Sequence, residues 1–176
     1  MQRKNWPTTQ RLQFRNYQPA DLDWLYEMSA DEEVMRYFET TLDLDGTTAL
    51  YHRLKNHIDL HRFGFWAVEL VETAEPVGMI GLGHPRFDPS LVEIGWRLRK
   101  KYWNHGLATE GAIACLTYGF DILGLNRIWS WTTVDNIASE RVMQKIGMQK
   151  YGYFNHPNVT PGHRTERHVQ YIMDKT

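Results

Sequence analysis

Three strand-favouring runs follow one another closely in the middle of this chain, and they constrain its fold more than any other feature of the sequence. Each run is apolar or rich in β-branched and aromatic residues, and polar stretches separate one run from the next. This arrangement predicts an antiparallel meander. The runs are FGFWAVEL, PVGMIGLGH and LVEIGWRL, at residues 63–70, 76–84 and 91–98.

The segments on either side of the meander alternate between strand and helix patterns. Helices are expected where apolar residues recur every three or four positions, and strands where β-formers dominate. The pattern predicts an α/β protein in which helices pack on a mixed sheet. Strands are predicted at 11–18, 127–133, 148–154 and 164–173, and helices after Pro19, at 45–62, at 106–124 ending with Gly124, and at 138–147 closed by Gly147.

Length, charge and cysteine content exclude several classes of protein. The 176 residues, of which 42% are hydrophobic, suit a single domain over residues 1–176. The formal net charge of -1 leaves no overall basic field, so neither nucleic acid nor a membrane is expected as a partner. Cys115 is the single cysteine, which excludes an internal disulfide. No apolar run is long enough for a signal peptide or a membrane span, and we expect a cytoplasmic location.

The stretch between the third run and the next helix has the features of an anion site. A strand ending near Leu98, a loop and a helix beginning near Gly106 direct free backbone N–H groups at one spot. Gly106 has no Cβ, so a bulky anion can approach the main chain. Positive charge lies beside the loop at Arg99, Lys100 and Lys101. An ordinary helix N-terminus is the alternative interpretation of the same residues.

A second unit further along the chain, read together with this loop, indicates a family. An asparagine at a strand end, a short helix, a glycine stop and another strand form DNIASERVMQKIGMQKYGYF. Together the two units resemble the GNAT superfamily of acyl-CoA-dependent N-acetyltransferases, whose phosphate loop has the pattern Q/R-x-x-G-x-G/A. Here the loop is WNHGLA, and its first position, Trp103, departs from the pattern.

The departure at Trp103 is similar to one branch of that superfamily, the RimJ/RimL-like acetyltransferases of protein N-termini and related amines. In this chain the branch's motif stands as YWNHGLATE. The opening RLQFRNYQPADLDWLYEMSADEEVMRYF and the closing HRTERHVQYIM also resemble the branch, so the resemblance covers residues 10–173. It implies a mostly antiparallel, seven-stranded sheet whose fourth and fifth strands run parallel but splay apart, flanked by about four helices.

The resemblance also implies acetyl-CoA as co-substrate. Its pantetheine arm is expected to pair with the backbone of Trp96 and Leu98 as an added strand would, and to meet the side-chain amide of Asn136. Arg99 and Lys145 are expected to add positive charge near the phosphates. A helix-cap role for Asn136 and a solvated position for Lys145 are the alternatives. Pyrophosphate is expected on the amides of Asn104, His105, Gly106, Leu107, Ala108 and Thr109.

Two residues are candidates for the chemistry itself. Glu93 is a carboxylate within the apolar run VEIGW, where desolvation favours a base of raised pKa, although a solvent-facing or ion-paired position is the alternative. Many superfamily members carry a tyrosine acid where Met143 stands here. Ser139 is the substitute in the RimL-like branch, unless it only caps or packs its helix. The amide near Leu98 is the expected oxyanion donor.

The histidines suggest a competing hypothesis, a metal site. His57 and His61 are four residues apart in a predicted helix, and His156, His163 and His168 gather near the end of the chain. No cysteine joins them and no His-Glu-x-x-His pattern is present, so no metal is expected. His168 and Tyr171 are candidates for the acceptor side of the cleft.

The sequence therefore predicts an enzyme that moves an acetyl group from acetyl-CoA to a primary amine by direct attack in a ternary complex. The acceptor is a protein N-terminus or a small amine, and a homodimer is suggested only by analogy with the branch. The alternative is a non-catalytic acyl-CoA-binding or interaction module with the same fold.

Overall fold

A computed structural model describes residues 6–175 of the chain. Its centre is a seven-stranded sheet in the order β1-β2-β3-β4-β5-β7-β6, in which β4 and β5 are parallel and all other neighbours are antiparallel. The predicted α/β fold with seven strands and four α-helices is confirmed. The strands are β1 (Leu12–Arg15), β2 (Phe65–Leu70), β3 (Pro76–Gly83), β4 (Glu93–Leu98), β5 (Arg127–Thr133), β6 (Gln149–Asn155) and β7 (Arg167–Asp174), and the helices are α1 (Asp21–Ala30), α2 (Leu44–His61), α3 (Leu107–Thr117) and α4 (Ile137–Lys145).

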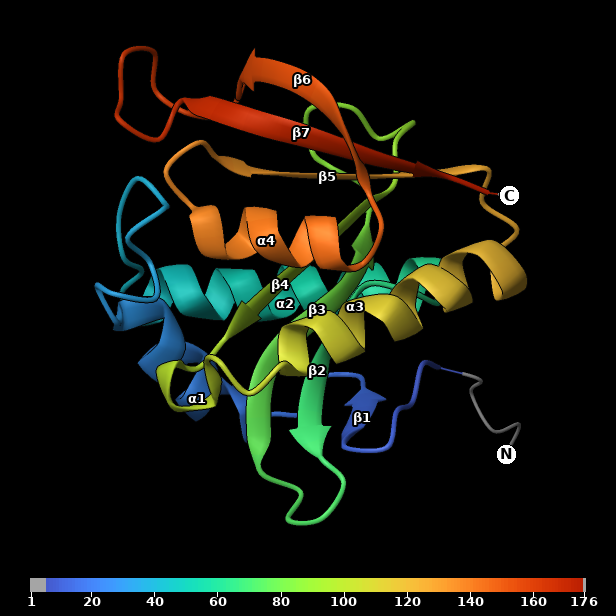
Figure 1. Ribbon diagram of the computed structural model, residues 1–176. Helices are drawn as coiled ribbons and strands as arrows, with labels where there is room; N and C mark the ends of the chain where they lie inside the picture. Colours follow the sequence, from blue (N-terminus) through green and yellow to red (C-terminus); the bar gives the residue numbers. More distant parts are fainter. Residues whose placement is uncertain (1–5, 176) are drawn as a thin grey trace.

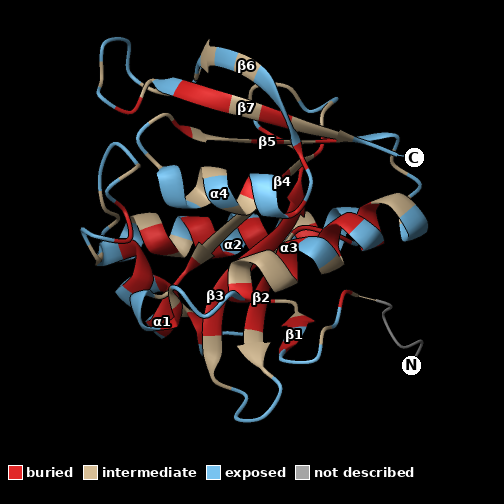
Figure 2. Ribbon diagram, in the orientation of Figure 1, coloured by how far each residue is buried: buried red, intermediate tan, exposed pale blue. Residues whose placement is uncertain are grey.

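The helices lie in layers on the sheet. In Figure 1, α3 and α4 lie in front of the strands and α2 lies behind them, and α1 packs against α2. Figure 2 shows that buried residues concentrate in the central strands and on the helix faces turned toward them. Trp66 and Ile80 are fully buried there, and each contributes roughly 1.5–3 kcal/mol through the apolar surface removed from water.

A glycine sets the distance between α3 and the sheet. A Cβ at Gly111 would lie 2.5 Å from the Cδ1 of Ile80, so only glycine allows this approach without repacking. Close packing at Gly111 fixes α3 against β3, and it thereby fixes the start of α3 relative to the neighbouring strand β4.

The parallel strands β4 and β5 separate soon after they meet. Their pairing is limited to the register Glu93↔Trp129, where the Trp129 N–H donates to the Val92 carbonyl at 3.0 Å. One step further, the Ser130 hydroxyl donates to the Ile94 carbonyl at 3.0 Å. The rest of β4 has no β5 partner in the described residues, which confirms the predicted splay.

Several predicted boundaries differ from the structure; β1, for example, spans Leu12–Arg15 and not 11–18. The helix predicted over 106–124 is α-helical only to Thr117 and continues as a π-type turn, η2 (Tyr118–Ile122), in which the Leu123 N–H donates to the Tyr118 carbonyl five residues back. Gly124 has a φ of 68° and ends the segment as predicted. The last strand begins at residue 167 instead of 164, because residues 163–166 form a turn.

The remaining expectations concern the whole chain. The predicted domain limits of 1 and 176 lie outside the described residues. Within residues 6–175, no helix has both the length and the apolar character that a membrane crossing requires.

Candidate active site

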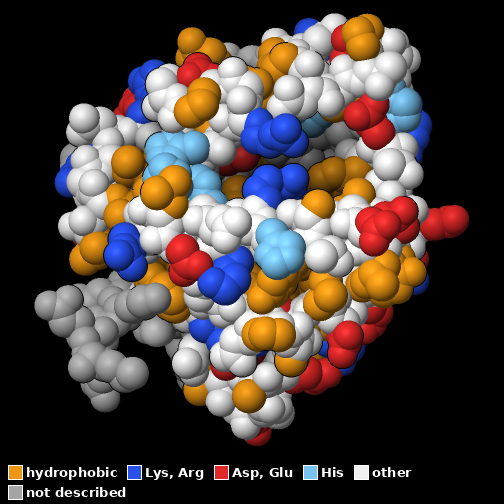
Figure 3. Space-filling view, turned by 180° about the vertical axis from the view of Figure 1, so that it is seen from behind, with side chains coloured by type: hydrophobic (Ala, Val, Ile, Leu, Met, Phe, Trp, Pro, Cys, Tyr) orange, Lys and Arg blue, Asp and Glu red, His pale blue; other side chains and the backbone are white. Residues whose placement is uncertain are grey.

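A cleft of about 1150 Å³ opens where β4 and β5 separate. Residues that line it come from β4, β5, the start of α3, α4, the loop between α1 and α2, and the loop between β6 and β7. Figure 3, a view from behind, shows a hollow with Lys or Arg side chains inside it and histidines near its edge. The predicted site residues in the cleft wall are Glu93, Trp96, Leu98, Asn104, Gly106, Leu107, Ala108, Thr109, Asn136, Ser139 and Lys145.

The start of α3 presents free backbone donors to the cleft. Gly106 is the N-cap with a φ of 75°, and no side chain caps the helix. No described residue accepts a hydrogen bond from the N–H of Leu107, Ala108 or Thr109. Because the helix dipole adds partial positive charge here, these amides suit an anion such as phosphate.

The loop before α3 is held in place by residues far away in the sequence. Arg11 donates from Nη1 to the His105 carbonyl at 3.0 Å and from Nε to Glu110 Oε2 at 2.6 Å. The indole N–H of Trp103 donates to the Leu98 carbonyl at 2.9 Å. Glu110 therefore braces the loop, and Trp103, the departure from the family pattern, joins the loop to the end of β4.

The backbone of β4 alternates between its two neighbours. Just after β4, the Arg99 N–H donates to the Val77 carbonyl on β3, whereas the Ile94 carbonyl accepts from Ser130 on β5. Even-numbered residues of β4 therefore direct their backbone groups toward β5, and Trp96 and Leu98 direct theirs into the gap. Both residues line the cleft, but the Leu98 carbonyl is already bonded to Trp103, so Leu98 offers only its N–H.

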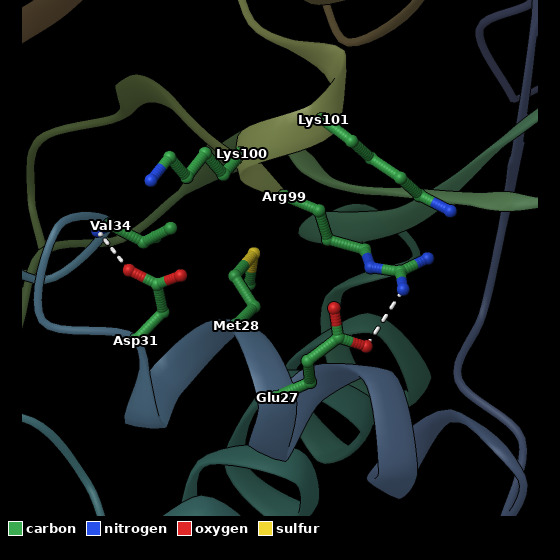
Figure 4. A pocket seen from close by; sticks show the side chains of 7 residues that line it. All are labelled: Glu27, Met28, Asp31, Val34, Arg99, Lys100 and Lys101. Atoms are coloured by element: carbon green, nitrogen blue, oxygen red, sulfur yellow. Dashed lines mark hydrogen bonds and ion pairs between the residues drawn. The ribbon is translucent and has the colours of Figure 1, made fainter.

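The cations predicted near the phosphates divide into two groups. Lys145 lines the cleft together with Arg141, and neither has an ion pair with a described residue. Arg99 does not line the cleft. It lies in a separate small pocket, where it donates to Glu27 at 2.8 Å (Figure 4). His105 is also absent from the cleft wall, and its carbonyl faces Arg11 instead.

Glu93 is a partly buried carboxyl in the cleft wall. Loss of solvent around it raises its pKa to about 8. None of residues 6–175 forms an ion pair or hydrogen bond with its side chain, so the ion-paired alternative does not apply. A carboxyl with this pKa can accept a proton near neutral pH.

Asn136 and Ser139 form a hydrogen-bonded pair at the start of α4. The Asn136 Oδ1 accepts from the Ser139 backbone N–H at 3.2 Å, so Asn136 caps the helix. Its Nδ2 donates to Thr132 Oγ1 at 2.8 Å and to Ser139 Oγ at 3.1 Å. Because the Ser139 oxygen accepts that bond, its own hydrogen stays available to a group in the cleft. Met143 is fully buried one turn further on.

Five histidines lie in two clusters, His57 with His61 and His84, and His156 with His168. The ring centroids of His57 and His61 are 4.4 Å apart, and that of His84 is 5.1 Å from His61. Desolvation and the two neighbouring histidines lower the pKa of His57 to about 4, so this ring is neutral at pH 7. Across residues 6–175, no group of three or more His, Cys, Asp or Glu side chains is arranged to hold a metal ion.

The last strand contributes one of the two side chains predicted for the acceptor side. His168 lines the cleft, and its ring is tilted against that of His156 with centroids 4.9 Å apart. Tyr171 does not line the cleft, because its hydroxyl donates to Glu140 at 2.8 Å. Residues three apart in a strand face opposite sides, so the two could not share this cleft.

Comparison with known proteins agrees with this geometry. The family described as "Acetyltransferase (GNAT) domain" matches residues 11–149. An uncharacterized N-acetyltransferase, YnaD of Bacillus subtilis, is 33% identical over 147 residues, covering 84% of each chain. The crystal structure of a GNAT-family acetyltransferase from Bacillus anthracis is 31% identical, with a TM-score of 0.81, covering 96% of this chain and 98% of its own. The chain belongs to the GNAT acetyltransferase family and is an acyltransferase.

A more distant structure shares the fold alone. RimL, a ribosomal α-N-protein acetyltransferase in complex with coenzyme A, superposes with a TM-score of 0.77 over 96% of each chain, at 14% identity. This similarity supports the seven-stranded architecture and carries no assignment of acceptor.

The structure brings three arginines into the cleft that the sequence analysis did not single out. They are Arg53 on α2, Arg86 on the loop after β3 and Arg97 on β4. Alternation along β4 could have identified Arg97, because it lies four residues after Glu93 and shares its side of the strand. No local pattern marks the other two.

Proposed function

We propose that this enzyme transfers an acetyl group from acetyl-CoA to a primary amine by direct attack within a ternary complex, in the manner of the RimJ/RimL-like branch. The observation that carries the proposal is the single cleft that joins the unpaired N–H groups at the start of α3 to Glu93 and Ser139. One end of this cleft suits phosphates and the other offers groups for proton transfer.

The residues present fit coenzyme A. The amides of Leu107, Ala108 and Thr109 would hold the pyrophosphate, with Arg141 and Lys145 close enough to line the same cleft. The free backbone groups of Trp96 would pair with the pantetheine amides as an added strand does. When bound, acetyl-CoA supplies the activated acyl group as a thioester.

Three chemical groups of the chain would take part in the acetyl transfer. Glu93 accepts the proton that the attacking amine loses, directly or through water. Trp103 bonds to the carbonyl of Leu98 and leaves the Leu98 N–H free. This N–H stabilises the negative charge that develops on the oxygen of the acetyl group. The Ser139 hydroxyl, positioned by Asn136, donates a proton to the departing sulfur. One proton leaves the nitrogen and one reaches the sulfur, so the reaction balances.

The acceptor is proposed to be a protein N-terminus or a small amine. RimL, with the same architecture, is a ribosomal α-N-protein acetyltransferase. The aromatic rings of Phe87 and Trp131, with centroids 5.3 Å apart, give this end of the cleft an apolar wall. The amine would lie between this wall and Glu93.

Thermal unfolding with acetyl-CoA, CoA, ATP or no ligand tests the cofactor part of this proposal. A ligand at 100 times its Kd adds about 2.7 kcal/mol, which raises the Tm by roughly 5 to 10 °C for a domain of this size. Stabilisation by both CoA species but not by ATP is expected. Absence of any shift with either CoA species would overturn the proposal.

Thiol release from acetyl-CoA tests the transfer itself. A mixture of primary amines and peptides with free N-termini should accelerate release, whereas the same peptides with acetylated N-termini should not. Equal release with both sets would indicate hydrolysis or no acceptor reaction, and would contradict transfer to an amine.

A further inference from the structure

Three arginines converge on the cleft without acidic partners. Arg53, Arg86 and Arg97 all line it, and none forms a salt bridge or donates a side-chain hydrogen bond within residues 6–175. Some other arginines of this chain have an acidic partner, for example Arg127 with Asp174. Unpaired cations that share a cavity repel one another, so the arrangement favours an anion that would bind between them.

Arg97 is the deepest of the three. Its Nε and Nη1 atoms are buried and have no hydrogen-bond partner. Burial, together with the charge of Arg53, lowers the pKa of Arg97 to about 10, so the side chain stays protonated at pH 7. A buried guanidinium without hydrogen bonds destabilises the folded chain unless a ligand supplies the acceptors.

The position of Arg97 is fixed by aromatic contact. Its Cζ atom lies 4.4 Å from the ring centroid of Phe38, in the loop between α1 and α2. Such a contact occupies a face of the guanidinium and leaves the N–H groups at its edge free. A planar fork of N–H donors matches the two oxygens of a carboxylate.

Arg53 and Arg86 extend the positive charge from Arg97 along the cleft. The pKa of Arg53 is lowered by desolvation and by the charge of Arg86, so these two side chains lie near each other. The charge of Arg53 in turn lowers the pKa of Arg97. The three arginines thus place positive charge in the same cleft as Glu93.

The other charges that face this region do not neutralise it. Glu33 is paired with Lys100, and Glu39 accepts a hydrogen bond from the Thr160 N–H at 2.9 Å. Glu93 has a pKa of about 8 and is largely protonated at pH 7. His57 and His156 have pKa values of about 4 and are neutral.

We propose that the acceptor amine carries a carboxylate, and that Arg97 binds this carboxylate with support from Arg53 and Arg86. The acceptor class is then an amino acid or a similar anionic amine, not a polycation. This inference rests on the proposed function, because it places the acceptor beside Glu93 in the same cleft.

Calorimetric titration of the full chain with CoA conjugates tests the inference without a known substrate. In each conjugate the CoA sulfur is joined through an acetyl linker to the nitrogen of glycine, β-alanine or 4-aminobutyrate, and each acid is compared with its carboxamide. For at least one length the acid should bind about tenfold or more tightly than the amide, as expected for a hydrogen-bonded charge pair.

Arg97→Met should abolish this preference and leave the affinity for CoA itself unchanged. Arg127→Met removes a cation that is paired with Asp174 and does not line the cleft, so it should keep the preference. The Tm of Arg97→Met serves as the folding control, and it should not fall, because the substitution removes an unsatisfied buried charge.

The possible outcomes distinguish the carboxylate inference from the proposed acetyltransferase function. If CoA binds but no conjugate length shows a preference for the acid, the carboxylate inference is wrong and the proposed function stands. A preference that survives Arg97→Met would overturn the role of Arg97. Failure of CoA itself to bind would overturn the proposed function, and the inference with it.

Discussion

Glu93 shows how burial alone gives a residue its chemistry. Its carboxyl has no charged partner among the described residues, and desolvation raises its pKa to about 8. A base works only when deprotonated, so we expect kcat/KM to rise with pH and to level off above about 8. Glu93→Gln should remove this rise and lower kcat/KM by about 10²-fold or more.

The measurement is a pair of pH–rate profiles at saturating acetyl-CoA. Glu39→Gln is a matched control, since Glu39 lines the same cleft but bonds to the Thr160 N–H. A rise with pH that persists in Glu93→Gln would show that another group, such as the acceptor amine, titrates there.

Single residues also mark the limit of what sequence could predict. Gly106, Asn136 and Ser139 were predicted to share a site with Glu93, and all of them line the cleft. The direction of Arg99 was not predictable, because it depends on Glu27, which lies 72 residues earlier in the chain. The roles of Glu93 as base and of Ser139 as acid stay predictions.

The start of α4 combines a helix cap with a proposed catalytic function. The Asn136 oxygen caps the helix, while its amide donates to Ser139 Oγ. Asn136→Asp keeps an oxygen for the cap but removes the donors, and the new carboxylate would compete for the Ser139 proton. We expect kcat to fall about tenfold or more while the Tm changes little, since a good cap is retained.

Ser139→Ala and Asn136→Ala complete this comparison. Ser139→Ala should lower kcat by up to about 10²-fold, and Asn136→Ala should lower kcat and also cost about 1 kcal/mol of stability through the lost cap. Thermal unfolding and steady-state thiol release separate the two effects. If Asn136→Asp has the wild-type kcat, the amide has no part in positioning Ser139.

The backbone N–H groups of β4 point alternately toward β3 and toward the gap, and this leads to a second prediction. Even-numbered residues direct their N–H groups into the gap, and odd-numbered residues bond to β3. Binding of CoA should therefore slow amide hydrogen exchange at Trp96 and Leu98 but leave Arg97 and Arg99 nearly unchanged. NMR detection resolves the four amides. Equal protection of all four would indicate general stiffening of the strand instead of an added-strand contact.

For the whole molecule, the order of elements was predictable because each helix and strand has its own local periodicity. The convergence of Arg53, Arg86 and Arg97 was not, because they come from α2, a loop and β4 and meet only after the sheet has formed. The π-type turn after α3 has no separate sequence signal either. Local patterns thus predict the scaffold and its loop, whereas the gathering of the three arginines depends on tertiary packing.

The splay of the sheet leaves few contacts between its two halves, and this makes Ser130 important for the whole fold. Its buried hydroxyl donates to the Ile94 carbonyl just where β4 and β5 separate. Ser130→Ala would leave that carbonyl without its partner and should cost about 1–3 kcal/mol, or roughly 2 to 10 °C in Tm. Ser90→Ala, which removes an exposed hydrogen bond to Asp88, should change the Tm by much less. Thermal unfolding without ligand measures both. Equal Tm values for Ser130→Ala and wild type would show that the helices packed on both halves, and not this bond, hold the two halves together.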